Sequence, residues 1–232
     1  NENHSPPTPS QDSMRSLYYL PLMVALIPAI TIHTTYLVSA FQGYVPWCVP
    51  YWDSCTSISA TGRYGASFYI FKATMLPAAF ILMKYWHDGG MKLQSNGQPG
   101  LAIFVIGTIG AVFLIVYTVA LGLEGDRFQA QRRVGIIIIF AFTILAQTLF
   151  TWRVHRTGVK DPCHRPQVVL LAVVLITGLV TLLLDSILAN YDDYEDAFEW
   201  AVALMLQLYF VLSHWSWKAL DSGARPVGVS GE

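Results

Sequence analysis

Long apolar runs recur along this chain and are separated by short polar stretches. A helix needs about 20 mostly apolar residues to cross a bilayer, so each run of that length predicts a membrane-spanning helix. The predicted helices cover residues 17–40, 68–86, 101–123, 134–152, 168–189 and 197–217. The sequence therefore predicts an all-α, polytopic membrane protein whose six transmembrane helices form a bundle.

The rest of the chain leaves no room for a separate soluble domain. Residues 1–16 are rich in Pro, Ser, Asn and Gln, which predicts a disordered N-terminal tail. Residues 17–220 form the predicted transmembrane domain, and residues 221–232 form a second flexible tail. Residues 41–67 make the longest connection between helices, and we expect a structured loop there.

The distribution of Lys and Arg predicts the orientation. These residues are concentrated in the N-terminal segment, in the connections after the second and fourth helices, and in the C-terminal tail. Cytoplasmic segments carry this excess in membrane proteins. We therefore expect both termini in the cytoplasm and the 41–67 loop on the extracytoplasmic side.

Composition narrows the function classes. The chain of 232 residues is 54% hydrophobic and 12% charged, whereas soluble domains carry about 25% charged residues. The net charge of −1 gives no basic surface for nucleic acid. Motifs for nucleotides, metal hydrolases or serine nucleophiles are absent from the sequence, so we expect no cofactor, and the question of catalysis stays open.

The cysteines agree with this orientation. Cys48 and Cys55 both lie in the 41–67 loop, on the predicted oxidising side, where a disulfide is permitted. Six residues separate them, so a bridge would close a small loop; the alternative is two free thiols packed among aromatic side chains. Cys163 falls on the cytoplasmic side, and we expect a free thiol.

Ionisable residues inside the predicted spans gather at one depth, in the extracytoplasmic half. Such groups are costly in a bilayer, face a cavity or the bundle interior, and are functional candidates. The candidates in or next to the spans are His33, Lys72, Glu124, Asp185 and Glu199. With Arg63 and Asp53 of the loop, they predict a polar pocket that binds a lipid headgroup.

Lys72 is the strongest of these candidates, and its role has several interpretations. Its ammonium could form a structural ion pair with Glu124, Asp185 or Glu199, while its stem lies along apolar surface. It could instead anchor the phosphate of a lipid. A Schiff-base or general-base lysine is the third interpretation.

His33 also has two interpretations, a buried side chain bonded to a neighbouring helix or an acid–base group near neutral pH. The predicted topology places His33 and His214 at opposite faces of the membrane, so they should not share a metal, and we expect no metal site. Pro28 and Pro77 interrupt the first two helices and favour a cavity over a tightly closed bundle.

Two segments of the chain resemble a known family. Residues 57–64 (SISATGRY) and 69–72 (YIFK) are similar to the signature of the Frag/DRAM/Sfk family of six-span membrane proteins. The resemblance implies a task connected with membrane lipids, such as remodelling of GPI-anchor lipids, phospholipid distribution or autophagy. The chain departs from the family pattern at Thr56, where proline is common, and at Lys72, where arginine is frequent.

Three functions follow as hypotheses. The first is a protein that binds or handles the headgroup of a phospholipid or glycolipid in an extracytoplasmic pocket. The second is a non-catalytic subunit or scaffold of a larger membrane complex, with protein partners in the membrane. The third is a lipid-remodelling acyl transferase or hydrolase, which needs a nucleophile or base close to the pocket.

Overall fold

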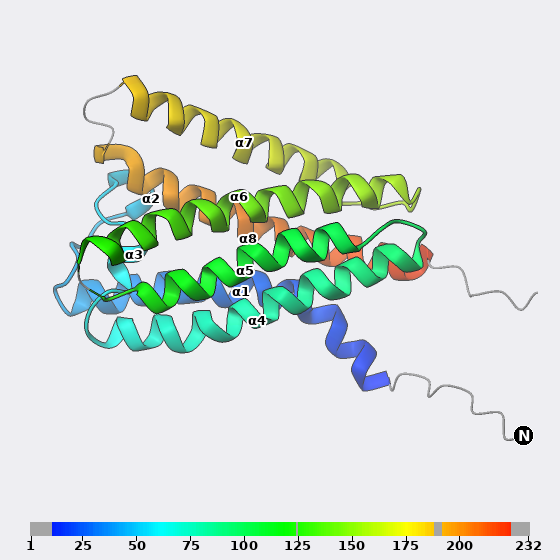
Figure 1. Ribbon diagram of the computed structural model, residues 1–232, viewed down its shortest axis with the longest axis horizontal. Coiled ribbons are helices and arrows are strands. Elements are labelled where there is room, and N and C mark those ends of the chain that lie inside the picture. Colours follow the sequence, from blue (N-terminus) through cyan, green and yellow to red (C-terminus); the bar gives the residue numbers. More distant parts are fainter. Residues whose placement is uncertain (1–10, 124, 188–191, 224–232) are drawn as a thin grey trace, which may run out of the picture.

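The computed structural model describes residues 11–123, 125–187 and 192–223, and its regular elements there are helices (Figure 1). The long helices are α1 (Gln11–Phe41), α4 (Gly65–Ser95), α5 (Leu101–Ala120), α6 (Asp126–Arg156), α7 (His164–Ile187) and α8 (Asp192–Gly223). Two single-turn helices, α2 (Pro50–Asp53) and α3 (Ile58–Thr61), lie between α1 and α4. The predicted all-α fold is confirmed.

Each long helix overlaps one predicted span, and most of them extend beyond it. Helix α1 begins at Gln11 rather than Leu17, and α4 continues past Trp86 to Ser95. An apolar run marks only the part of a helix inside the hydrocarbon, whereas the hydrogen-bonded backbone continues into the interface. The other parts of the expected tails, residues 1–10 and 224–232, lie outside the described residues.

All six long helices are long and apolar enough to cross a membrane. The protein is therefore an integral, multi-pass membrane protein. Helix α1 begins and α8 ends at the same end of the bundle, on the right in Figure 1. We call this the terminal end, and the opposite end, which carries α2 and α3, the cap end.

Neighbouring helices in the chain also neighbour each other in space. Helix α5 packs between α4 and α6, and α1 packs between α4 and α8. Helix α7 contacts α8 and α6 along the edge and diverges from them toward the cap end (Figure 1). Apolar side chains such as Ile176 and Leu182 are exposed on α7, where they meet lipid tails in a bilayer.

Aromatic side chains fill the terminal half of the bundle. Tyr85 of α4 and Trp217 of α8 are fully buried and stack with ring centroids 5.0 Å apart. The Tyr85 hydroxyl donates to Ser213 Oγ at 2.9 Å, and Thr151 shares a 2.7 Å hydrogen bond with Tyr209. Buried hydroxyls without such partners would be costly, so these bonds help to fix how α4, α6 and α8 pack.

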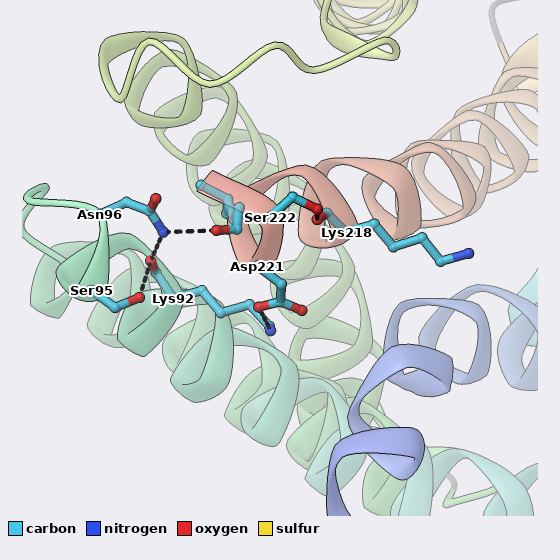
Figure 2. A network of polar contacts seen from close by, with 7 residues as sticks. Lys92, Ser95, Asn96, Lys218, Asp221 and Ser222 are labelled. Carbon is cyan, nitrogen blue, oxygen red and sulfur yellow. Dashed lines mark hydrogen bonds and ion pairs between the residues drawn. The ribbon is translucent and has the colours of Figure 1, made fainter. Parts of the chain in front are cut away.

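A polar network closes the terminal end (Figure 2). Lys92 near the end of α4 forms an ion pair with Asp221 near the end of α8. The side-chain amide of Asn96 donates to the carbonyls of Lys92 at 2.8 Å and Leu220 at 3.2 Å. Carbonyls in the last turn of a helix lack partners within that helix, so Asn96 satisfies one from each helix and ties the two ends together.

Glycines allow the closest helix contacts. A Cβ built on Gly107 of α5 would lie 2.2 Å from Cγ of the buried Trp86 ring of α4. Gly90 and Gly100 likewise bring the end of α4 against the start of α5, where a Cβ on Gly100 would meet the Gly90 carbonyl. Small residues at such positions let the backbones approach.

Replacing Gly107 by Ala should therefore destabilise the protein by about 1–3 kcal/mol, because the buried Trp86 ring must shift to admit the methyl group. Gly178→Ala is the matched control: Gly178 lies within α7, and a Cβ there meets nothing within 4 Å. Alanine's helix propensity, worth up to about 1 kcal/mol over glycine, should leave that variant as stable as the parent or more so. Thermal unfolding in detergent checks both, and a Gly107→Ala protein as stable as Gly178→Ala would contradict this packing.

Candidate functional site

Residues 42–64, with α2 and α3, fold across the end of the bundle and form a structure that we call the cap (Figure 1). Cys48 and Cys55 are joined by a disulfide, with Cα atoms 6.6 Å apart, so the predicted bridge is confirmed. The backbone N–H of Cys48 donates to the Tyr36 hydroxyl at 2.8 Å, and that hydroxyl donates to the Cys48 carbonyl at 2.6 Å. One phenol of α1 thus satisfies both backbone groups of a bridged cysteine.

Trp200 of α8 is the main contact between the cap and the bundle. Its side chain is 1% exposed, and its indole N–H donates to the Thr56 carbonyl at 2.8 Å. Its ring makes edge contacts with Tyr36 and Tyr51 at centroid distances of 6.1 and 5.4 Å. Aromatic pairs in this geometry add to the stabilisation from burial, so α8 holds the cap from below.

His33 also binds the cap to α1. Its Nδ1 lies 2.6 Å from the Ala29 carbonyl, which can only accept, so Nδ1 carries a proton. In the tautomer with its proton on Nδ1, Nε2 accepts from the Tyr51 hydroxyl at 2.8 Å. Burial raises the pKa of Tyr51, which keeps this phenol protonated as the donor. Both ring nitrogens are engaged, which agrees with a histidine bonded to a neighbouring element.

The segment that resembles the family signature forms α3. The Ser57 hydroxyl accepts from the Ala60 N–H at 3.1 Å and begins the helix as an N-cap. The Thr61 hydroxyl meets that of Thr35 in α1 at 3.2 Å. These contacts hold α3 against α1 at the cap end, directly after the bridged loop.

Four polar side chains meet beneath α3, and we call them the cap cluster: Ser59, Arg63, Tyr117 and Glu199. Arg63 Nη2 donates to Ser59 Oγ at 3.2 Å, while Arg63 Nε is buried without a partner among the described residues. The Glu199 carboxylate accepts a hydrogen bond from the backbone N–H of Ile58. The Tyr117 hydroxyl is buried within electrostatic range of both Arg63 and Glu199. The cluster thus offers a guanidinium group, a carboxyl group and two hydroxyls.

Lys72 has a different environment from the one the sequence suggested. Its Nζ donates to the Val119 carbonyl at 3.2 Å and lies 4.2 Å from the centre of the Phe68 ring. Arg132 of α6 donates to the carbonyl of Leu123 at 2.8 Å, in the turn that follows α5. Cations are favourable beside the unpaired carbonyls at a helix C-terminus, so Lys72 and Arg132 stabilise the end of α5.

Lys72 forms no ion pair with Asp185 or Glu199 in the described part of the chain, so the predicted pair is wrong for these two partners. The ion pairs found there all involve the terminal half of α4. Glu124, the third predicted partner, lies outside the described residues. The Asp185 side chain is exposed near the end of α7, which diverges from the bundle, and lies outside the cluster.

Asp53 is exposed and accepts from the Val49 N–H at 2.7 Å, so it closes the turn that contains α2. It therefore shapes the cap and does not enter the cap cluster. Among the described residues, no group of three His, Cys, Asp or Glu side chains could hold a metal ion.

An apolar cavity of about 120 Å³ lies in the bundle below the cap cluster. Its wall comes from every long helix except α7, together with Ile58 of α3. It runs along the helices, from Ala203 to Phe210 on α8 and from Ile136 to Thr143 on α6. Pro28, one of the prolines expected to favour a cavity, lines it, whereas Pro77 is exposed and does not.

Two residues connect the cluster with the cavity. Tyr117 lines the cavity with its ring and brings its hydroxyl to the cluster, and Ile58 lines the cavity while its N–H binds Glu199. Tyr117 could not be singled out from the sequence, because a tyrosine inside an apolar helix resembles an ordinary core residue. Trp200 follows the candidate Glu199 in the chain. It was not singled out because an aromatic residue at that depth is typical of the interfacial belt.

Comparison with known protein families, characterised proteins and solved structures finds no match to this chain. The fold and the site define an integral membrane protein with six candidate spans and a disulfide-bridged cap. What the site does therefore has to be argued from its own geometry.

Replacing Lys72 by Met should lower the free energy of unfolding by about 1 kcal/mol, because one hydrogen bond to a helix-end carbonyl is lost. Lys218→Met, at an exposed position of α8, is the control and should have almost no effect. A loss of about 3–5 kcal/mol for Lys72→Met in chemical unfolding would instead reveal a buried carboxylate left without its partner.

Proposed function

We propose that this protein binds a membrane amphiphile, a phospholipid or glycolipid, with its headgroup at the cap cluster and one chain in the apolar cavity. The observation that carries the proposal is the continuity of the two sites through Tyr117 and Ile58. A polar cluster directly above an apolar slot matches the two halves of such a molecule. A purely structural cluster would not need the cavity below it.

An unsatisfied donor of the cluster supports the headgroup half. A buried guanidinium N–H without an acceptor is costly, and Arg63 Nε is in this position among the described residues, while the Tyr117 hydroxyl is buried beside Ser59. A phosphate oxygen would accept from Arg63, and arginine is well suited to phosphate because its N–H groups form a planar fork. Glu199 would accept from hydroxyls of a sugar or glycerol.

The shape of the cavity supports the chain half. Its lining covers about two turns on α1, α6 and α8 and about three turns on α4, which corresponds to about 10–16 Å along the bundle. Dry cavities of about this volume, lined by Leu, Ile and Phe, bind apolar molecules in other proteins. A chain segment would restore van der Waals contacts that the empty wall lacks.

Binding is favoured over nucleophilic catalysis by the contacts of the cap hydroxyls. Ser59 Oγ meets Arg63 and Ser57, rather than a histidine or carboxylate that would take its proton. His33 has both ring nitrogens engaged by Ala29 and Tyr51. The resemblance of residues 57–72 to the Frag/DRAM/Sfk signature points to the same lipid-related task.

We further propose that the cap end faces the lumen or exterior and that both termini are cytoplasmic. The excess of Lys and Arg at the terminal end supports this orientation. The Cys48–Cys55 disulfide supports it as well, because disulfides persist in oxidising compartments.

Lipids that co-purify with the protein test the proposal directly. Native mass spectrometry of the detergent-purified protein should show one retained phospholipid or glycolipid, identified by extraction of the same sample. Arg63→Gln should reduce its occupancy about tenfold or more, because a charge-assisted contact with phosphate is lost.

Arg133→Gln is the matched control, since Arg133 is an exposed arginine of α6 toward the same end of the bundle. Its lipid occupancy should equal that of the parent. A parent protein that is free of lipid and carries a defined protein partner would contradict the proposal and favour the scaffold hypothesis.

A further inference from the structure

One polar side chain lies in the cavity wall, well below the cap cluster. Gln207 of α8 lines the cavity, and its Oε1 is buried without a hydrogen-bond partner among the described residues. Most of the remaining wall is apolar, apart from Thr143 on α6 and the hydroxyl of Tyr117 at the cap end. A buried amide oxygen without a donor costs about 1–3 kcal/mol, so we expect a bound molecule to donate a hydrogen bond to it.

The depth of Gln207 is set by α8. Glu199 of the cap cluster precedes it by eight residues on the same helix, which places Gln207 about 12 Å farther along the bundle axis at 1.5 Å per residue. Thr143 is the lining residue of α6 farthest from the cap end, because α6 runs from that end toward the terminal end. The polar groups Gln207 and Thr143 therefore lie toward the inner part of the slot.

We infer that the amphiphile bound here carries a hydroxyl on its chain, about 12 Å from its headgroup, and that Gln207 recognises it. This inference rests on the proposed lipid-binding function and adds the chemical class of the chain. A hydroxyl both donates and accepts, so it satisfies the Gln207 amide in either orientation of its oxygen and nitrogen. A plain hydrocarbon chain would leave the amide oxygen unsatisfied.

A water molecule is the competing partner for Gln207. A buried water typically makes about three hydrogen bonds to polar groups, and this part of the slot offers the side chains of Gln207 and Thr143 in an otherwise apolar wall. A chain hydroxyl requires only one or two polar contacts, because its carbon neighbours fill the apolar remainder. The composition of the wall therefore favours a chain hydroxyl.

Two matched probes test this inference, lysophosphatidylcholine with an 8-hydroxystearoyl chain and the same lipid with a stearoyl chain. They compete for delipidated protein in detergent, and native mass spectrometry reads their occupancies. The parent protein should prefer the hydroxylated probe about five- to tenfold, the effect of one hydrogen bond to a buried group. Gln207→Leu should bind both probes equally, and Gln207→Met provides a second apolar variant if the first does not fold.

Each outcome separates the inference from the proposed function. Equal binding of both probes by the parent would overturn the hydroxyl inference and leave the lipid-binding proposal standing. A preference that persists in Gln207→Leu and Gln207→Met would overturn the role of Gln207. A parent that binds neither probe would overturn this inference, and it would overturn the proposed function as well if the purified protein also retains no phospholipid or glycolipid.

Discussion

The structure at the cap end depends on one constraint: polar backbone groups that leave a helical bundle inside or beside lipid must find partners within the protein. Two aromatic side chains meet this requirement. The Tyr36 phenol bonds both the N–H and the carbonyl of Cys48, and the Trp200 indole bonds the Thr56 carbonyl. Since these partners belong to α1 and α8, the cap is fixed to two of the helices that line the cavity.

The position of the cap decides what lies below it. With the Cys48–Cys55 loop held in place, α3 sits over the bundle, and its first N–H meets Glu199 while Ser59 meets Arg63. The cluster is polar and partly unsatisfied, whereas the cavity beneath it is apolar apart from a few groups. This contrast within about 10 Å is the basis for the proposal that the site binds an amphiphile.

The sequence predicts the fold well, because six long apolar runs in a chain of this length leave few alternatives to a helical bundle. The bridge is one of two possibilities left open by two cysteines in one predicted extracytoplasmic loop, and the structure shows the bridged form. The partners of Lys72 could not be predicted from the sequence. The predicted depth in the membrane indicates which residues lie at the same level, but it does not indicate which of them face one another. Lys72 therefore meets the end of α5, and Asp185 lies apart on the peripheral α7. Tyr117 and Gln207 were missed because their meaning depends on a cavity that appears only when the helices are assembled.

The central claim is that a lipid chain lies inside the bundle beneath the cap, and photo-crosslinking tests it most directly. A phospholipid with a diazirine in its acyl chain is added to the protein in bilayers, and the modified residues are mapped by mass spectrometry. Crosslinks at the cavity residues Met75 of α4 and Phe140 of α6 are the predicted result. Crosslinks confined to the exposed face of α7, at residues such as Ile176 and Leu182, would contradict it and reduce the cavity to a packing defect.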